Sequence, residues 1–216
     1  MRLAATASTN DAAAVLAAAG WPEGTVVVAG HQHGGRGRQG RPWLSPPGTG
    51  LCFSVILRPS RPLREWADLS WVIAAAVAVV ARAAGAGGVG LKYPNDVVAG
   101  GRKLSGVLLE TRTGAGAAAA LIAGIGLNVC AAVEDFPAEL RELATSLRIE
   151  TGRPHQAAAL LAGLCGEIDA WYASWEAGGE AAARARLAAA GLAVGADGSG
   201  NGALESGAVR AKEEGG

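Results

Sequence analysis

The feature that most restricts the fold is a stretch rich in glycine, arginine and proline between two apolar runs. Residues 31–50 combine repeated glycines with three prolines, so they can form neither a long helix nor a central strand. The flanking runs Thr25–Gly30 (TVVVAG) and Leu51–Leu57 (LCFSVIL) are apolar and β-branched, which predicts buried strands. The chain is therefore expected to carry a long loop between two strands of a sheet.

The remaining pattern mixes helices and strands. Apolar residues at three- and four-residue spacing predict helices over 64–84 and 156–176; the alanine-rich segment 10–19 and a short segment over 138–147 are also expected to be helical. Further strands are expected over Val89–Tyr93, Leu104–Thr111 and Ala118–Val129, the last two joined in a hairpin at Gly114-Ala115-Gly116. Because strands and helices do not alternate regularly, the predicted fold is α+β, with a mixed, largely antiparallel sheet and flanking helices.

The charge balance limits the possible partners. Basic and acidic residues number 19 each, so neither DNA nor an anionic membrane is expected to bind the domain as a whole. The start of the chain lacks the long apolar region of a signal peptide, and no transmembrane helix is expected. The three cysteines are widely spaced and without a CxxC pair, which indicates reduced thiols and a cytoplasmic protein.

The segment His31–Arg41 (HQHGGRGRQGR) is the most unusual candidate site. It holds three arginines and no acidic residue, and its glycines allow backbone N–H groups to approach an anion. Gly35-x-Gly37-x-x-Gly40 formally matches a dinucleotide fingerprint, but the prolines that follow prevent the helix which that fingerprint must open. An RNA-binding Arg-Gly cluster and a plain solvated loop remain as alternatives.

Two shorter segments also attract attention. Lys92 precedes a Pro-Asn-Asp turn at the end of an apolar strand, where it could be a fixed cation or an ordinary edge-strand lysine. Gly124 and Gly126 interrupt another strand before Asn128, which indicates close approach of backbone or ligand, although Asn128 could simply be a turn residue. His31, His33 and the cysteines have no metal-site spacing, so metal ligands cannot be assigned.

In this order, the segments resemble the catalytic domain of the biotin protein ligases. The resemblance spans roughly residues 6–175 and rests on five runs: Ser8-Thr9-Asn10; Gly35–Trp43 with Gln32 before it; Lys92–Asp96; Gly101–Glu110; and Gly124–Asn128. It implies a class II synthetase-like biotin/lipoate ligase fold. It also implies an enzyme that activates biotin with ATP and Mg²⁺ to biotinyl-5'-AMP, then transfers biotin to a lysine of a biotin carboxyl carrier domain.

The resemblance further implies roles for individual residues. Catalytic roles fall on Lys92, Arg38 and Arg36, with Lys92 between the biotin carboxylate and the α-phosphate. The expected biotin-binding residues are Ser8, Thr9, Asn10, Gln32, Gly35, Arg36, Gly37, Arg38, Lys92, Gly106 and Gly124. The expected ATP and adenylate residues are Arg38, Arg41, Trp43, Lys92 and Asn128, with Trp43 stacking on adenine. A homodimer is possible. Lipoyl or octanoyl transfer, a nucleic-acid-binding module, and a biotin-binding remnant without transfer activity are the alternatives.

The sequence also departs from the family. His33 stands where Thr is usual, and Tyr93 stands where Trp is usual. No N-terminal helix-turn-helix precedes the catalytic motifs, so a repressor function is not expected. We expect residues 1–190 to form the catalytic domain, and residues 191–216 to be a poorly ordered or hairpin remnant of the family's small C-terminal β-barrel.

Overall fold

The computed structural model describes residues 1–114 and 117–195, whose strands form one mixed sheet. The eight strands lie in the order β1-β2-β3-β7-β6-β5-β4-β8. Their bounds are β1 (Arg2–Leu3), β2 (Val26–Ala29), β3 (Gly50–Leu57), β4 (Val89–Lys92), β5 (Asp96–Ala99), β6 (Arg102–Gly114), β7 (Ala117–Asn128) and β8 (Ala193–Gly195). The outermost pairs β1–β2 and β4–β8 are parallel and the others antiparallel, so the predicted sheet type is confirmed.

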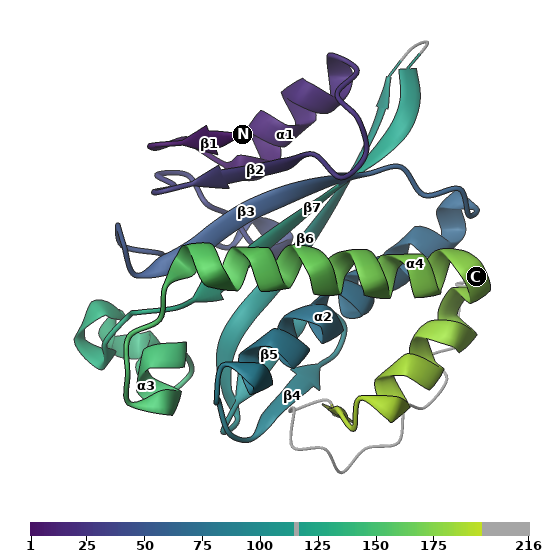
Figure 1. Ribbon diagram of the computed structural model, residues 1–216. Coiled ribbons are helices and arrows are strands. Elements are labelled where there is room, and N and C mark those ends of the chain that lie inside the picture. The colour runs from purple at the N-terminus through teal and green to yellow at the C-terminus, as the bar shows by residue number, and fades with distance from the viewer. Residues whose placement is uncertain (115–116, 196–216) are drawn as a thin grey trace, which may run out of the picture.

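Helices cover both faces of the sheet. Their bounds are α1 (Thr9–Ala18), α2 (Leu69–Ala83), α3 (Leu147–Thr151) and α4 (Ala157–Ala189), with short 3-10 turns at Arg38–Gly40, Leu63–Asp68, Val133–Asp135 and Ala138–Leu140. The helices α2 and α4 pack together on one face (Figure 1). On the other face α1 covers only the end formed by β2, β3 and β7, which leaves the rest of that face open for a site.

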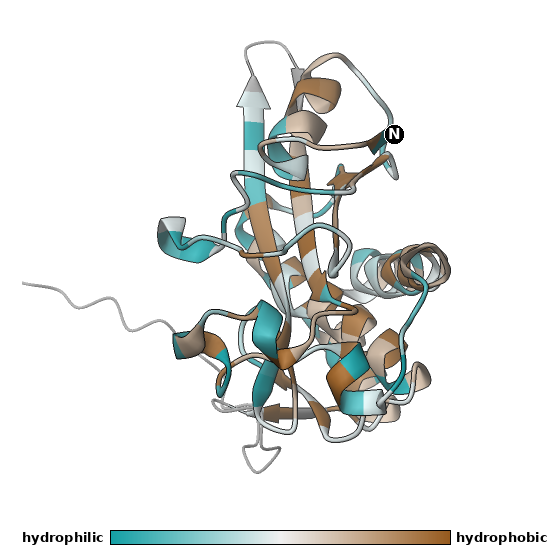
Figure 2. Ribbon diagram, turned by 90° about the vertical axis from the view of Figure 1, so that its left-hand side faces the viewer, coloured by the Kyte–Doolittle hydropathy of each residue, from teal (hydrophilic) through white to brown (hydrophobic). Residues whose placement is uncertain are grey.

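The alternation of residues along β3 and β7 explains the two faces. Phe53, Leu121 and Leu127 point toward α2 and α4 and are at most 1% exposed. The intervening residues Ile56 and Ile122 pack under α1. Because side chains alternate along a strand, each long strand supplies the main core with one set of residues and the opposite face with the other. Figure 2 shows the hydrophobic residues concentrated along the sheet and the helices beside it.

The predicted helix over 138–147 is wrong. Only the turn at 138–140 and the short helix α3 form, because the intervening backbone bonds to β6 instead. Lys103 N donates to Leu143 O at 2.7 Å, and Thr145 N donates to Lys103 O at 2.9 Å. Ser146 then caps α3, its hydroxyl accepting from Ile149 N at 3.1 Å. Tertiary pairing with a strand overrode the local apolar spacing.

The C-terminal helix is longer than predicted. The predicted segment 156–176 continues to Ala189, with a break at Gly179, whose φ of 64° and ψ of −152° are accessible only to glycine. The strand β8 follows and pairs with β4, so residues 193–195 join the main sheet. The hairpin tip 115–116 and the tail 196–216 lie outside the described residues, and the division at residues 190 and 191 stays a prediction.

One helical stretch in the described part of the chain, Leu63–Ala83, is long and apolar enough to cross a membrane by composition alone. Within its most apolar window, 61% of the residues are buried inside the protein. Such burial between a sheet and α4 is typical of the core helix of a globular domain, so the composition by itself is weak evidence for a membrane span.

Candidate active site

A cleft of about 630 Å³ opens on the sheet face that α1 leaves uncovered. Its walls come from the start of α1, the segment His31–Arg41 (the arginine-glycine loop), the β4–β5 turn, and the middle of β6 and β7. The predicted site residues that line it are Ser8, Thr9, Asn10, Gln32, Arg36, Gly37, Arg38, Arg41, Trp43, Lys92, Gly106, Gly124 and Asn128. Segments more than a hundred residues apart in sequence therefore meet in one place.

Glycines make the floor of the cleft. The strand register puts Ser54, Gly124 and Leu108 in one row, and Cys52, Gly126 and Gly106 in the next. A Cβ at Gly124 would lie 2.1 Å from Asn10 Oδ1, and a Cβ at Gly126 would lie 2.4 Å from Trp43 Cε2. The glycines inside β7 are thus required by close approach of two side chains predicted to bind ligand.

A polar pocket forms where α1 begins. Ser8 caps the helix, its hydroxyl accepting from Asn10 N at 3.2 Å. Gln32 Oε1 accepts from both Thr9 N at 2.7 Å and Thr9 Oγ1 at 2.9 Å, which orients its amide. Buried Ser54 donates either to Thr9 Oγ1 at 2.8 Å or to Asn10 Oδ1 at 2.6 Å. The pocket wall is therefore held in a defined arrangement before any ligand enters.

Asn10 is fixed on three sides. Its Nδ2 donates to Glu110 Oε2 at 2.9 Å and to Leu108 O at 3.4 Å, while its Oδ1 accepts from Ser54. A carboxylate only accepts hydrogen bonds, so the orientation of the Asn10 amide follows from Glu110. Asn10 is 4% exposed and lies flat on Gly124.

The three arginines of the loop have different surroundings. Arg36 bonds both oxygens of Asp11, at 2.8 and 2.5 Å, and bonds Glu110 Oε1 at 3.1 Å. These carboxylates raise the pKa of the Arg36 guanidinium, and Arg36 lowers the pKa of Asp11. The loop contains no acid in its sequence, yet the fold supplies two partners for its first arginine.

Arg38 and Arg41 keep their charge available. Arg38 Nη1 donates to the neutral Asn95 Oδ1 at 3.1 Å, which joins the loop to the β4–β5 turn across the cleft. The exposed Arg41 forms no side-chain hydrogen bond or ion pair with any residue of 1–114 or 117–195. The cationic character predicted for the loop therefore resides in these two residues.

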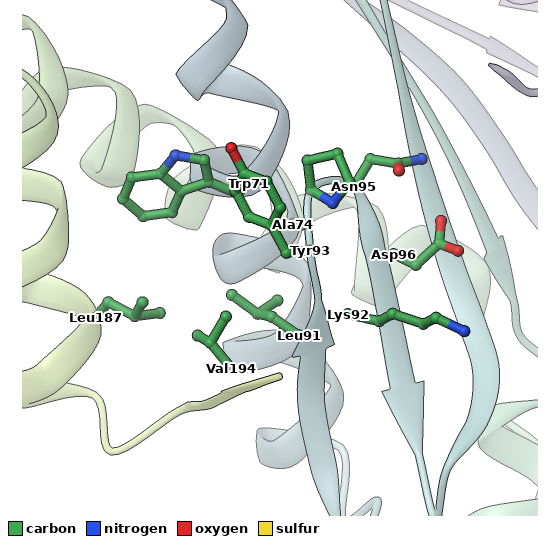
Figure 3. Close-up of a pocket in the computed structure, with 10 residues that line it drawn as sticks. Trp71, Ala74, Leu91, Lys92, Tyr93, Asn95, Asp96, Leu187 and Val194 are labelled. Atoms are coloured by element: carbon green, nitrogen blue, oxygen red, sulfur yellow. The ribbon is translucent and has the colours of Figure 1, made fainter. Parts of the chain in front are cut away.

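Two lysines, and not one, reach the cleft. The Lys92 side chain is exposed and makes no hydrogen bond or ion pair with a described residue. Figure 3 shows Lys92 and Asp96 extending to one side of the β4–β5 turn, while Leu187 and Val194 lie on the other side around a small apolar cavity of about 10 Å³. Lys103 Nζ lies 2.7 Å from Asp96 Oδ1, within the cleft and beside Gly106.

Trp43 occupies part of the cleft. Its indole lies on Gly126, and Lys103 Nζ lies 5.7 Å from the ring centroid, a cation-π distance. The indole Nε1 is buried and has no hydrogen-bond partner among the described residues. The Trp43 ring is therefore held at the floor of the cleft beside the Lys103 ammonium group, and its Nε1–H has no acceptor among the described residues.

The two remaining predicted site residues, Asn128 and Gly35, differ in their position relative to the cleft. Asn128 Nδ2 donates to Thr145 O at 2.9 Å, and the residue is 6% exposed. Gly35 is the predicted residue that does not line the cleft; it packs against Trp43 and Gln32 within the loop region. A Cβ there would be 2.9 Å from Trp43 O and 3.0 Å from Gln32 Nε2, so glycine allows the loop to close on itself.

Sequence reasoning did not select Lys103, Asp96 or Glu110 as site residues. All three lie within motifs that carried the family resemblance, and Lys103 precedes the cleft residue Gly106 by three positions. The position of Lys103 depends on a β-bulge, since the β5–β6 register shifts between Val97 and Val98 and pairs Val98 with Lys103. Alternation along β6 would have put Lys103 on the face opposite Gly106, whereas Glu110 has the same phase as Gly106 and Leu108.

Metal ligation has little support in the described part of the chain. No group of three or more His, Cys, Asp or Glu side chains there could hold a metal ion. Asp96, a carboxylate that lines the cleft, is already paired with Lys103.

Comparison with known proteins points to one family. The model of the biotin/lipoate A/B protein ligase family matches residues 3–128. A bifunctional ligase/repressor BirA of Bacillus spizizenii is 43% identical over 147 residues, which are 67% of this chain and 45% of that protein. A biotin–[acetyl-CoA-carboxylase] ligase of Mycobacterium tuberculosis is 38% identical over 148 residues, 65% of this chain and 53% of that protein. The chain thus spans about half the length of these relatives.

A solved structure shows the same fold. The biotin protein ligase of Aquifex aeolicus in complex with biotin and ATP superimposes with a TM-score of 0.71 at 30% identity, over 82% of this chain and 72% of that one.

Proposed function

This chain belongs to the biotin/lipoate A/B protein ligase family, and we propose that it joins biotin to a lysine of a biotin carboxyl carrier domain at the expense of ATP. One observation carries the proposal. A polar pocket at the start of α1, two lysines and the loop arginines share a single cleft. The polar pocket suits a neutral ring that forms hydrogen bonds. The lysines and arginines suit two negative groups that must be brought together.

The polar pocket would hold the ureido ring of biotin. The Ser8 hydroxyl accepts a bond from Asn10 N, so its proton can donate to the ureido carbonyl. Gln32 uses its carbonyl oxygen on Thr9, which turns its amide nitrogen away as a further donor. Because these groups are pre-oriented, little ordering is needed when biotin binds.

Charge at the other end of the cleft would serve the reaction. Bringing the biotin carboxylate to the α-phosphate opposes two negative groups, at about 1 kcal/mol for a separation of 4 Å in water and about 4 kcal/mol at an effective dielectric near 20. Fixed cations are therefore required when water is excluded to protect the adenylate. Lys103, Lys92 and Arg38 line the space in which these groups would meet.

We place Lys103 ahead of Lys92 as the central cation. Lys103 is held by Asp96 at 2.7 Å and is 39% exposed, whereas Lys92 is exposed and no described residue holds it. A preorganised cation stabilises developing charge without first being ordered. Lys92 would then act at the rim, together with Arg38 and Arg41, on the pyrophosphate part of ATP.

Trp43 would stack on the adenine ring. The Lys103 ammonium now lies over the indole, a contact of about 0.5–1 kcal/mol at an exposed site. Adenine on the ring would replace this contact, while the ion pair with Asp96 would keep Lys103 in the cleft. Asn128, the remaining predicted adenylate residue, lies near Trp43 on the floor of the same cleft.

The two steps balance without a covalent enzyme intermediate. A carboxylate oxygen of biotin attacks the α-phosphorus of ATP, and pyrophosphate leaves; the acceptor lysine then attacks the acyl carbon, and AMP leaves. Mg²⁺ would enter as part of the ATP substrate, coordinated by its phosphates, since a resident protein site does not fit the described residues. The use of ATP supports the proposal that the reaction takes place in the cytoplasm. A homodimer stays a prediction.

The decisive experiment is ATP-dependent transfer of biotin to a purified carrier domain. We expect biotinylation of the carrier lysine, with one AMP and one pyrophosphate released per biotin transferred. Calorimetry with biotin and with lipoate gives the control, because the family includes ligases for both acids. Lipoate binding without biotin binding would overturn the proposal. Binding to nucleic acid that weakens steeply with salt would favour the alternative function of the loop.

A further inference from the structure

The first arginine of the loop does something different from the other two. Arg36 forms a two-pronged ion pair with Asp11 on α1, and also bonds Glu110 on β6. Its side chain is 31% exposed and that of Glu110 is 20% exposed. Because two carboxylates already use its charge, Arg36 is poorly suited to receive a phosphate, and is well suited to anchor the loop to the body of the domain.

Glu110 belongs to two structures at once. Its Oε1 and Oε2 accept from Arg36 Nη2 at 3.1 and 3.2 Å, and its Oε2 also accepts from Asn10 Nδ2 at 2.9 Å. Arg112 adds an exposed contact at 3.3 Å. A single carboxylate therefore bonds both the loop anchor and a wall of the polar pocket.

The position of Asn10 makes this contact consequential. Asn10 lines the cleft and lies within 3.0 Å of the Cβ position that glycine leaves empty at 124. Without Glu110 the Nδ2 side keeps only the longer bond to Leu108 O at 3.4 Å, and Ser54 bonds only the Oδ1 side, so the amide would be held less firmly. A change at Glu110 is thus transmitted to the pocket as well as to the loop.

We propose that Glu110 is a positioning residue that couples the biotin pocket to the arginine-glycine loop, and that Asp11 anchors the loop alone. This inference rests on the proposed function. Glu110 orients the Asn10 amide for biotin and also fixes Arg36. The loop segment after Arg36, which includes Arg38 and Arg41, then closes over the ligand while Arg36 stays in place. Asp11 contacts Arg36 but neither Asn10 nor Ser54 through any side-chain hydrogen bond among the described residues.

A carboxylate is required at position 110 for a chemical reason. Glutamate offers two oxygens that only accept, and both of its main partners only donate through the contacting atoms. A glutamine has the same size but one accepting oxygen, and its NH₂ group would face a donor. Glu110→Gln therefore removes the negative charge and one accepting oxygen, which weakens the contacts with both Arg36 and Asn10, while keeping the volume of the side chain.

The two carboxylates can be separated experimentally with Glu110→Gln and Asp11→Asn. Glu180→Gln serves as the control, because Glu180 pairs with Arg184 within α4 and neither residue lines the cleft. The first readout needs no ligand: the rate at which trypsin cleaves after Arg36 and Arg38 in the native protein. We expect about tenfold faster cleavage in Glu110→Gln and in Asp11→Asn, the equivalent of one lost charged contact, and no change in Glu180→Gln.

The second readout is biotin affinity by calorimetry without ATP. We expect about tenfold weaker binding for Glu110→Gln, which loosens Asn10, and affinity within about twofold of wild type for Asp11→Asn. The third readout is the rate at which biotinyl-adenylate is released from the enzyme. Both variants should release it several-fold faster, because both free the base of the loop. A general loss of stability would not separate affinity from release in this way.

Each failure has its own signature. If both variants keep the wild-type cleavage rate, Arg36 is not an anchor and the inference is wrong. If affinity falls equally in the two variants, Glu110 does not act through Asn10 and the coupling is wrong. If wild type binds no biotin, the proposed function fails and the pocket half of the inference fails with it, while the cleavage assay still decides the anchor.

Discussion

The two faces of the central sheet are built from the same strands and yet carry different residues. On β7, Leu121 and Leu127 point into the core beneath α2 and α4, while Gly124, Gly126 and Asn128 point into the cleft. On β3, Phe53 and Ser54 divide in the same way. One face buries large side chains to stabilise the domain; the other omits side chains so that Asn10, Trp43 and a ligand can approach. Because successive residues of a strand point to opposite faces, neighbouring residues serve the stability of the core and the function of the cleft in turn.

The largest effect is expected on the cleft face. Lys103→Ala should slow biotinyl-adenylate formation by about 10²–10³-fold, the usual loss when one preorganised donor at a developing charge is removed. Lys92→Ala is the matched control and should cost roughly tenfold, since Lys92 is not held in place. Single-turnover pyrophosphate release measures both, and thermal melting should show an intact fold. The opposite ranking would return the central role to Lys92.

On the core face, Leu127→Ala should lower the free energy of unfolding by roughly 3 kcal/mol, because Leu127 is 1% exposed and truncation leaves a cavity. Biotin affinity per folded molecule should stay at the wild-type value. Urea unfolding and calorimetry together test the separation of the faces. A large loss of affinity without loss of stability would show that the core face also shapes the pocket.

A smaller effect is expected from a single methyl group on the cleft face. Gly124→Ala puts a Cβ where Asn10 Oδ1 is 2.1 Å away, so the Asn10 amide or the strand must move. We expect biotin to bind roughly tenfold to thirtyfold more weakly, with a change in stability below that of Leu127→Ala. Unchanged binding would mean that Asn10 is not part of the pocket wall.

Loop closure should produce a change of several-fold. Arg38→Gly removes the bond to Asn95 that joins the loop to the β4–β5 turn, and should loosen retention of the adenylate. Labelling of bystander lysines by escaped biotinyl-adenylate should then rise. Counting biotin on a mixture of unrelated proteins measures it, with Arg64→Gly, on an exposed surface segment, as the control. Flat labelling would remove Arg38 from the closing segment.

The smallest expected effect is a pH dependence of the anchor. Arg36 lowers the pKa of Asp11 from its ordinary value of 3.8, so the ion pair stabilises the folded state above that pH. The stability is lost as the pH falls through the lowered pKa of the folded protein. The difference in urea midpoint between wild type and Asp11→Asn should therefore be constant near pH 6 and shrink below 3.8. A constant difference down to pH 2 would contradict the assignment.

Local patterns predicted much of the fold. Thr25–Gly30 and Leu51–Leu57 became β2 and β3, and the spacing of Trp66, Leu69 and Val72 predicted the helical stretch that ends in α2. The pattern failed over 138–147, where backbone pairing with β6 outweighed a weak helical signal. It also missed β5, which is only four residues long, and the continuation of α4, because Gly178-Gly179 is a typical helix end although Ala183 and Leu187 beyond it keep helical spacing.

The sequence motifs predicted most of the residues that line the cleft, but they did not predict which charged side chains form ion pairs with one another. The sequence by itself determined the floor and the loop: glycines inside β7, and arginines among glycines and prolines, allow few other uses. Only the tertiary structure decided which charges remain available, because Asp11 and Glu110 approach Arg36 from 25 and 74 residues away, and a β-bulge brings Lys103 to Asp96. The reason is physical: a backbone preference acts between neighbours in the chain, whereas the state of a charge depends on what lies within a few ångströms of it in space.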